Sequence, residues 1–125
     1  MMFYSICETQ NGDILIGTDQ GLYQYHLGDH EAVRFKYSDG LANKVIGKNI
    51  ESQNGDIWCA TSMGIWQFDQ RKKQFIGHVS GNGLTTKEYI NCVGIRTDDD
   101  MIYFANNDGL TVFNASQVKG CHKDL

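Results

Sequence analysis

The residues of this chain best suited to metal chemistry are a pair of histidines and a run of aspartates. His26 and His30 are four residues apart, a spacing that holds a metal ion when both lie on a helix. The residues around them instead indicate the passage from a strand into a turn, so we interpret both as solvated loop histidines. The run Asp98-Asp99-Asp100 is similar to an acidic calcium-binding turn. Calcium takes about six or more oxygen ligands, and further ligands are not evident, so a plain solvated turn is favoured. The sequence predicts no metal and no cofactor.

Aromatic side chains offer a second kind of chemistry, because an aromatic ring can stack on the face of a sugar. Trp58 occupies a core position of a repeated segment, which favours packing in the interior over ligand binding. Trp66 shares its place in that segment with Tyr23 and with Thr111, and the tolerance of threonine indicates partial exposure. We therefore expect Trp66 and Tyr23 to be the candidate contacts with a ligand or partner. The remaining residues are expected to form the scaffold.

Composition disfavours several classes of function. Nucleophilic catalysis needs a serine or cysteine near a histidine and a carboxylate, and no Gly-x-Ser-x-Gly motif occurs, so we expect no enzyme activity of this segment. The net charge is −4 and the one basic cluster spans 71–73, which argues against binding of nucleic acid. No apolar stretch approaches the ~20 residues that cross a bilayer, so we expect no direct membrane contact. The disulfide state stays open, since no Cys-x-x-Cys pair occurs among the four cysteines, Cys7, Cys59, Cys92 and Cys121.

A repeat with a period of 43 residues organises the chain. The segment QNGDILIGTDQGLYQY at 10–25 returns as QNGDIWCATSMGIWQF at 53–68, and a looser third copy, DDDMIYFANNDGLTVF, spans 98–113. A Gly-Leu landmark at 40–41 returns at 83–84 with the same spacing. Two independent landmarks with one period indicate a true repeat. We place the units at about 4–46, 47–89 and 90–118, followed by a polar tail at 119–125.

Each unit contains four short runs rich in β-branched and aromatic residues, separated by turn residues. The chain has 14 glycines and no proline, so its turns must use Gly, Asn and Asp. Four short strands in about 40–45 residues, repeated, are typical of a β-propeller blade. The small residue at the end of the inner run fits a crowded position where blades converge; it is Gly17, Ala60 or Ala105. The sequence predicts an all-β fold of about three four-stranded antiparallel blades with almost no helix.

The number of units is smaller than a closed propeller needs. The 125 residues hold about three units, whereas propellers close with about four to eight blades. The segment 114–125 is polar, so the third unit is expected to lack its outer strand. We interpret the chain as an incomplete propeller fragment. Its expected partners are the remaining blades of a parent propeller, and the isolated fragment is expected to self-associate.

The repeat resembles the two-component regulator propeller repeat. That family's pattern runs approximately D-x-x-G-x-(L/I)-W-(I/V)-G-T-x-x-G-(L/I)-x-x-(Y/F). The segment 11–25 matches with Leu15 in the tryptophan position, and 54–68 has Trp58 in place while Cys59-Ala60 replaces the Ile-Gly pair. The third copy is similar to the family's last blade, although Ala105-Asn106 departs from its Gly-Gly pair. The Gly-His and Trp-Asp signatures of WD40 repeats are absent.

The resemblance implies a periplasmic location, within the sensor region of an inner-membrane hybrid two-component histidine kinase of the Bacteroidetes type. The segment itself would be non-catalytic, and the propeller would scaffold or bind an oligosaccharide or another glycan-derived signal. No ligand-contact residue follows from the resemblance, because the family's motif residues are structural. Two alternatives stay open: a stand-alone propeller module for protein–protein interaction, and a fragment of a propeller lyase with similar repeats. A lyase should bring a histidine, an acid and a metal together on its loops.

Overall fold

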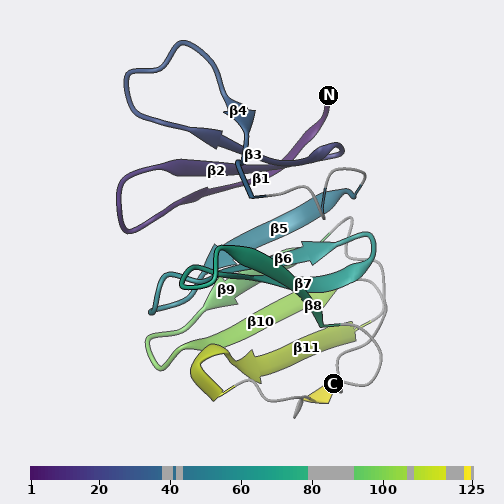
Figure 1. Ribbon diagram of the computed structural model, residues 1–125. Coiled ribbons are helices and arrows are strands. Elements are labelled where there is room, and N and C mark those ends of the chain that lie inside the picture. The colour runs from purple at the N-terminus through teal and green to yellow at the C-terminus, as the bar shows by residue number, and fades with distance from the viewer. Residues whose placement is uncertain (38–40, 42–43, 79–91, 107–108, 118–122, 125) are drawn as a thin grey trace.

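The computed structural model describes residues 1–37, 41, 44–78, 92–106, 109–117 and 123–124 (Figure 1). These residues form three antiparallel sheets of four strands each, which confirms the predicted all-β class. The first sheet contains β1 (Phe3–Glu8), β2 (Ile14–Thr18), β3 (Gly21–Tyr25) and β4 (Val33–Arg34). The second contains β5 (Ile46–Glu51), β6 (Ile57–Thr61), β7 (Gly64–Asp69) and β8 (Gln74–His78). The third contains β9 (Val93–Arg96), β10 (Met101–Asn106), β11 (Gly109–Asn114) and β12 (Lys123–Asp124), with a 3₁₀ turn at Ala115–Gln117.

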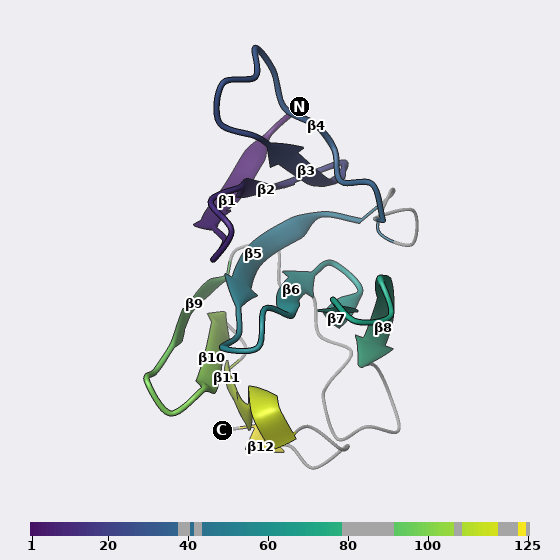
Figure 2. The same cartoon turned by 60° about the vertical axis from the view of Figure 1, so that its left-hand side comes forward.

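The strands of each sheet pair in chain order, and the three sheets stack in succession (Figures 1 and 2). The first strands of the sheets, β1, β5 and β9, contact one another in sequence. The later strands fan outward from this shared inner line (Figure 2). This arrangement of up-and-down sheets around common inner strands is that of propeller blades. Among the described residues, none forms a helix of the length and apolar character that a membrane span requires.

The turn between the first two strands recurs in all three sheets. Gly12 and Gly55 lie in the left-handed region there, with φ of 91° and 93°, where a glycine carries no steric cost. In the third sheet Asp100 takes the same position with φ of 66°. A Ser or Thr hydroxyl donates across each turn, as Ser52 does to Asn54 Oδ1 at 2.6 Å. The Asn, Asp and Gly residues of the repeat therefore specify the hairpin that opens each blade.

The core consists of two apolar clusters, one in each seam between neighbouring sheets. We call the face of a sheet that points to the preceding sheet its leading face, and the opposite face its trailing face. In the first seam the trailing residues Leu15, Leu22 and Phe35 meet the leading residues Ile57, Cys59 and Phe68. In the second seam Ile50, Trp58 and Ile65 meet Ile102, Phe104 and Phe113. Both faces of the middle sheet are covered, and all five residues of β6 are buried, which explains why its sequence shows no alternation.

Close approach of the blades is clearest at Gly17. A Cβ at this position would lie 2.7 Å from the carbonyl oxygen of Ile46 on the next sheet, so the expected crowding at the inner position is confirmed. At the outer edge β4 is only two residues long, yet Phe35 and Tyr37 continue along one side and pack on the first cluster, as the alternation predicted. The backbone N–H of Phe35 still donates to Leu22 at 2.9 Å.

The outer strand of the third sheet is a correction to the sequence analysis. The polar segment 114–125 predicted none, but β12 pairs with β11 through Asp124 opposite Thr111 and Lys123 opposite Val112. Backbone pairing over two residues needs no apolar pattern, which is why the sequence carried no signal for it. Residues 39–40, the landmark at 82–84 and most of the tail at 119–125 lie outside the described residues. The unit boundaries at 46, 89 and 118 stay a prediction.

Candidate functional site

A groove of about 460 Å³ opens between the first and second sheets. It lies at the edge where the β1–β2 and β5–β6 turns are found, because residues of both turns line it. The first sheet contributes β2, β3 and the segment after β4. The second sheet contributes the ends of β5 and β7, the start of β6 and the β7–β8 turn. The groove is therefore a product of blade stacking, and no single repeat contains it.

The floor of the groove is apolar and aromatic. Leu15 and Ile57 from the two sheets meet beneath it. Phe35 and Phe68 pack edge to face with their ring centroids 5.1 Å apart, and Tyr37 stacks on Phe68 at 5.6 Å with 23° between the planes. Tyr37 is half-buried, so part of its ring faces the groove. Such an aromatic surface favours a ligand that carries an apolar face.

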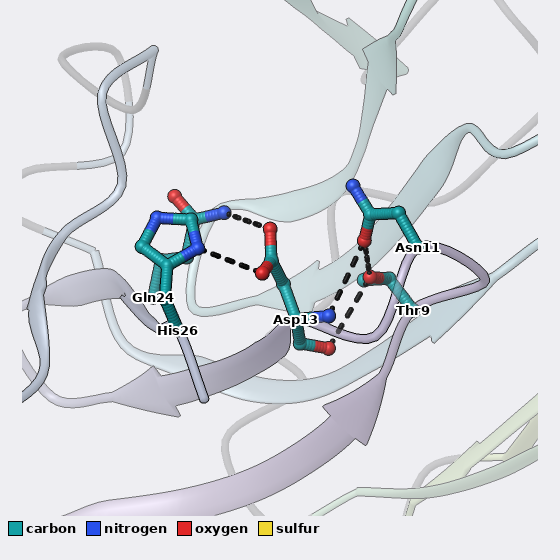
Figure 3. A network of polar contacts seen from close by, with 5 residues as sticks. All are labelled: Thr9, Asn11, Asp13, Gln24 and His26. Carbon is teal, nitrogen blue, oxygen red and sulfur yellow. Dashed lines mark hydrogen bonds and ion pairs between the residues drawn. The ribbon is translucent and has the colours of Figure 1, made fainter. Parts of the chain in front are cut away.

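The polar wall of the groove is built around Asp13 (Figure 3). Its carboxylate accepts a hydrogen bond from Gln24 Nε2 at 2.9 Å and lies 2.7 Å from His26 Nδ1. Thr9 and Asn11 brace the turn behind it, because the Thr9 hydroxyl donates to the Asp13 carbonyl at 3.2 Å and the Asp13 N–H donates to Asn11 Oδ1 at 3.3 Å. The side chain of His26 is 51% exposed, whereas that of Asp13 is 19% exposed. The wall thus presents an oriented imidazole to solvent.

A comparison with the second sheet shows which of these contacts belong to every blade and which occur only at the groove. Gln67 donates to Asp56 at 2.8 Å, in the same places as Gln24 and Asp13, so this carboxylate–amide pair holds the blade together in both sheets. The position of His26 is occupied by Asp69 in the second sheet. His26 is therefore the residue that distinguishes this groove from the repeat.

Charges of both signs surround the groove. Asp13 and Glu51 supply carboxylates, and Lys36 and Lys73 supply ammonium groups. Partial burial raises the pKa of Glu51, an effect opposed by the hydrogen bond from the Gln10 N–H at 2.9 Å and by the charge of Arg96. Among the described residues that line the groove there is no serine or cysteine, so the His26–Asp13 pair has no nucleophile of that kind beside it. The arrangement is one for binding a polar molecule with an apolar face.

Trp66 and Tyr23, the contacts predicted from the sequence, lie elsewhere. Tyr23 is half-buried on the leading face of the first sheet, with the Arg34 guanidinium 6.0 Å from its ring centroid. Trp66 is half-buried on the leading face of the second sheet, under the Lys44 ammonium at 4.8 Å, and its indole N–H donates to the Met63 carbonyl at 3.3 Å. The two rings occupy equivalent positions on different sheets and do not meet. Their role as ligand contacts stays a prediction.

Two of the residues considered for metal binding, His26 and Asp100, have other partners. His26 pairs with Asp13, and His30 is exposed in the β3–β4 loop. Asp100 is buried with only 4% of its surface exposed, so the expectation of a plain solvated turn is wrong at this residue. Its Oδ1 accepts the Gln53 N–H at 3.1 Å. Within the described ranges, no three His, Cys, Asp or Glu side chains gather as a metal site would require.

The described cysteines are unpaired thiols. Cys7, Cys59 and Cys92 form no disulfide, and Cys121 lies outside the described residues. Burial raises the pKa of each of the three, to about 11 for Cys92, and Cys59 is completely enclosed in the first seam. A thiol held in its protonated form is a poor nucleophile. These cysteines act as small apolar packing residues.

The groove was missed by the sequence analysis, although part of its signal is visible there. Asp13 and Gln24 recur as Asp56 and Gln67 with identical spacing, which marks a paired structural contact. His26 follows this pair in the first copy of the repeat, and the second copy has no histidine at the equivalent position. Nothing in the sequence shows that the ring of Tyr37 reaches the same space, because that contact depends on how two sheets stack.

The sequence matches no family model and no curated protein. Among solved structures, the chain is similar to the extracellular domain of a candidate one-component system from B. thetaiotaomicron, with a TM-score of 0.67 and 20% identity. The chain is three blades of a β-propeller. The alignment covers 95% of this chain and 18% of that protein, so these blades correspond to a small part of a much larger domain. Selenomethionine-substituted virginiamycin B lyase from Staphylococcus aureus aligns over 98% of this chain and 55% of its own length, with 13% identity and a TM-score of 0.46.

Proposed function

We propose that these three blades belong to the periplasmic sensor domain of a hybrid two-component histidine kinase and take part in sensing a glycan-derived signal. The fold shared with an extracellular domain over 95% of the chain supports an extracytoplasmic sensor. The resemblance of the repeats to the two-component regulator propeller supports the kinase context. In this proposal the remaining blades of a parent propeller are the partners, and the segment itself has no catalytic activity.

The ligand site in this proposal is the groove between the first and second sheets. One observation carries it: the exposed part of the Tyr37 ring and the His26–Asp13 pair line the same space of about 460 Å³. A sugar ring has an apolar C–H face that packs on an aromatic ring, and hydroxyls that need donors and acceptors at its edge. The groove supplies donors and acceptors for these hydroxyls with the side chains of Gln10, Asn11, Gln70 and Glu51. Such a site accepts neutral or acidic oligosaccharides, since Lys36 and Lys73 complement an acidic group.

Isothermal titration calorimetry of the 125-residue chain against a panel of neutral and acidic oligosaccharides tests the proposal. We expect saturable binding of at least one member and a loss of affinity of about tenfold or more in Tyr37→Ala. His26→Ala should weaken binding as well. The matched control is His30→Ala, which changes an exposed histidine of the same loop outside the groove. Absence of saturable binding across the panel, or equal affinity of wild type and Tyr37→Ala, would contradict the groove as the ligand site.

A further inference from the structure

The stack of three sheets ends in two outer faces, and both are apolar. No other sheet of the described residues packs on either face. On the leading face of the first sheet, Ile6 lies beside Ile16, which lies beside Tyr23, and Ile14 lies beside Tyr25. On the trailing face of the third sheet, Ile95 lies beside Tyr103, which lies beside Val112, and Val93 lies beside Ala105, which lies beside Leu110. Ile6 is 67% exposed, and Val93 and Ile95 are 71% and 62% exposed.

These faces are the two halves of an interface that the chain already makes twice. Ile50, the equivalent of Ile95, is only 8% exposed because the third sheet covers it, and Trp58, the equivalent of Tyr103, is fully buried. On the opposite side, Ile57 and Cys59 are buried where the first sheet has the half-buried Ile14 and Ile16. In both internal seams a trailing face packs on a leading face, and each outer face keeps the apolar character of its internal counterpart.

We propose that the 125-residue chain associates head to tail with a second copy of itself, the trailing face of each third sheet docking on the leading face of the other copy's first sheet. Each copy then contributes one half of each new seam, so the contact is heterologous. A heterologous contact forms a closed ring when the rotation that relates one copy to the next leads back to the first copy. Two copies together have six blades, which lies within the range of about four to eight blades in which propellers close. Each outer face is thus covered by the opposite outer face of the other copy, whose apolar residues are named above. The proposal concerns the 125-residue chain by itself, without further blades of a parent propeller on these faces, and it does not depend on the ligand of the groove.

The new seams would lack a polar contact that both internal seams share. In the first internal seam Gln10 Nε2 donates to the Gln53 carbonyl at 3.0 Å, and in the second Gln53 Nε2 donates to the Asp98 carbonyl. Each of the first two blades thus reaches the turn of the following blade through a glutamine. Asp98 occupies the glutamine position of the third unit, and a carboxylate cannot donate this bond. The intermolecular seam therefore depends on apolar contact, and Asp98→Gln should strengthen it.

Sedimentation velocity and light scattering test the proposal on the wild-type chain and on single variants. We expect wild type to be a dimer of about 28 kDa, twice the 14.1 kDa of one chain. Ile6→Asp and Ile95→Asp, each on an exposed position of a different outer face, should both be monomeric with unchanged circular dichroism. The matched control is Leu27→Asp, which places the same charge in the β3–β4 loop at a site 92% exposed and should remain dimeric. Asp98→Gln should lower the dimer Kd by about 25-fold, the effect of one added hydrogen bond in each of the two seams.

Mixing the two monomeric variants identifies which faces meet. Ile6→Asp keeps an intact trailing face and Ile95→Asp an intact leading face, so the mixture should form a heterodimer through one seam. A contact between like faces would instead leave one of the two variants dimeric by itself, and that result would overturn the proposal. A monomeric wild type, open-ended polymers, or a mixture that stays monomeric would overturn it too.

Discussion

Asp100 accepts a hydrogen bond from the backbone N–H of Gln53 across the seam between the second and third sheets, with 3.1 Å between Gln53 N and Asp100 Oδ1. Asp100 stands where the first two sheets have Gly12 and Gly55, and it keeps their left-handed backbone with φ of 66°. Its own N–H donates to the Thr97 carbonyl at 3.0 Å and its carbonyl accepts from Ala115 at 2.9 Å. One residue thus closes a turn and ties two blades together.

The two roles of Asp100 can be separated by substitution. Asp100→Gly removes the acceptor but suits the positive φ, so we expect a loss of about 1 kcal/mol in the free energy of unfolding. Asp100→Ala removes the acceptor and adds the cost of a left-handed alanine, so its loss should be larger by about 1 kcal/mol. Asp100→Asn keeps an Oδ1 acceptor and tolerates the conformation, so it should lose least. Urea unfolding measures all three, and equal stability of the Gly and Ala variants would contradict the backbone argument.

The repeat made most of the blade architecture predictable. Each Asn-Gly turn is followed by a strand-length apolar run, and the structure places a hairpin at each. The core role that the sequence predicted for Trp58 is confirmed, because its side chain is fully buried. These features depend on local turn chemistry and on a pattern that recurs, and a single sequence contains both.

The features that could not be predicted depend on contacts between blades. Asp100 looks like part of a solvated acidic run, yet the seam buries it against Gln53, 47 residues earlier in the chain. The groove has the same origin, because Asp13 and Glu51 come from different sheets. The outer strand β12 pairs with β11 over two residues, and backbone pairing leaves no trace in side-chain periodicity. Contacts of this kind require the angle and distance between sheets, which no repeat spacing specifies.

Glu51 should make the stability of the chain depend on pH. Partial burial raises its pKa in the folded protein above the ordinary value of 4.5, so the folded state binds the proton more tightly than the unfolded state does. Its stabilising contribution is therefore fully present below about pH 4.5 and is lost as pH rises through the folded pKa. Glu51→Gln keeps an acceptor for the Gln10 N–H without the charge, so its stability relative to wild type should increase from pH 4 to pH 7.

Denaturant unfolding at a series of pH values measures this difference. Glu8→Gln is the control, since it removes a carboxylate from an exposed position of β1. A constant stability difference between Glu51→Gln and wild type across this range would show that burial does not perturb Glu51. A difference of opposite sign would show that the hydrogen bond from Gln10 and the charge of Arg96 outweigh burial.

Trp58 combines the largest fully buried side chain of the described core with an unmet polar group. Its ring lies against His78 at 5.1 Å and Phe113 at 4.7 Å between centroids, and its indole N–H finds no hydrogen-bond partner among the described residues. An enclosed donor without a partner costs about 1–3 kcal/mol, which offsets part of what the ring contributes by packing. Trp58→Ala removes both and leaves a cavity in the second seam, so it should destabilise the chain by about 3–5 kcal/mol.

Trp58→Phe separates the two effects, because it removes the unmet N–H and keeps an aromatic ring against Phe113. We expect it to cost less than about 1.5 kcal/mol, since relief of the buried donor compensates for the smaller ring. Trp66→Phe is the matched control, because that indole N–H already donates to Met63 and its loss brings no such relief. Urea unfolding followed by circular dichroism avoids reliance on tryptophan fluorescence. If Trp58→Phe were as unstable as Trp58→Ala, the indole would be required in full, and its N–H would have a partner in solution.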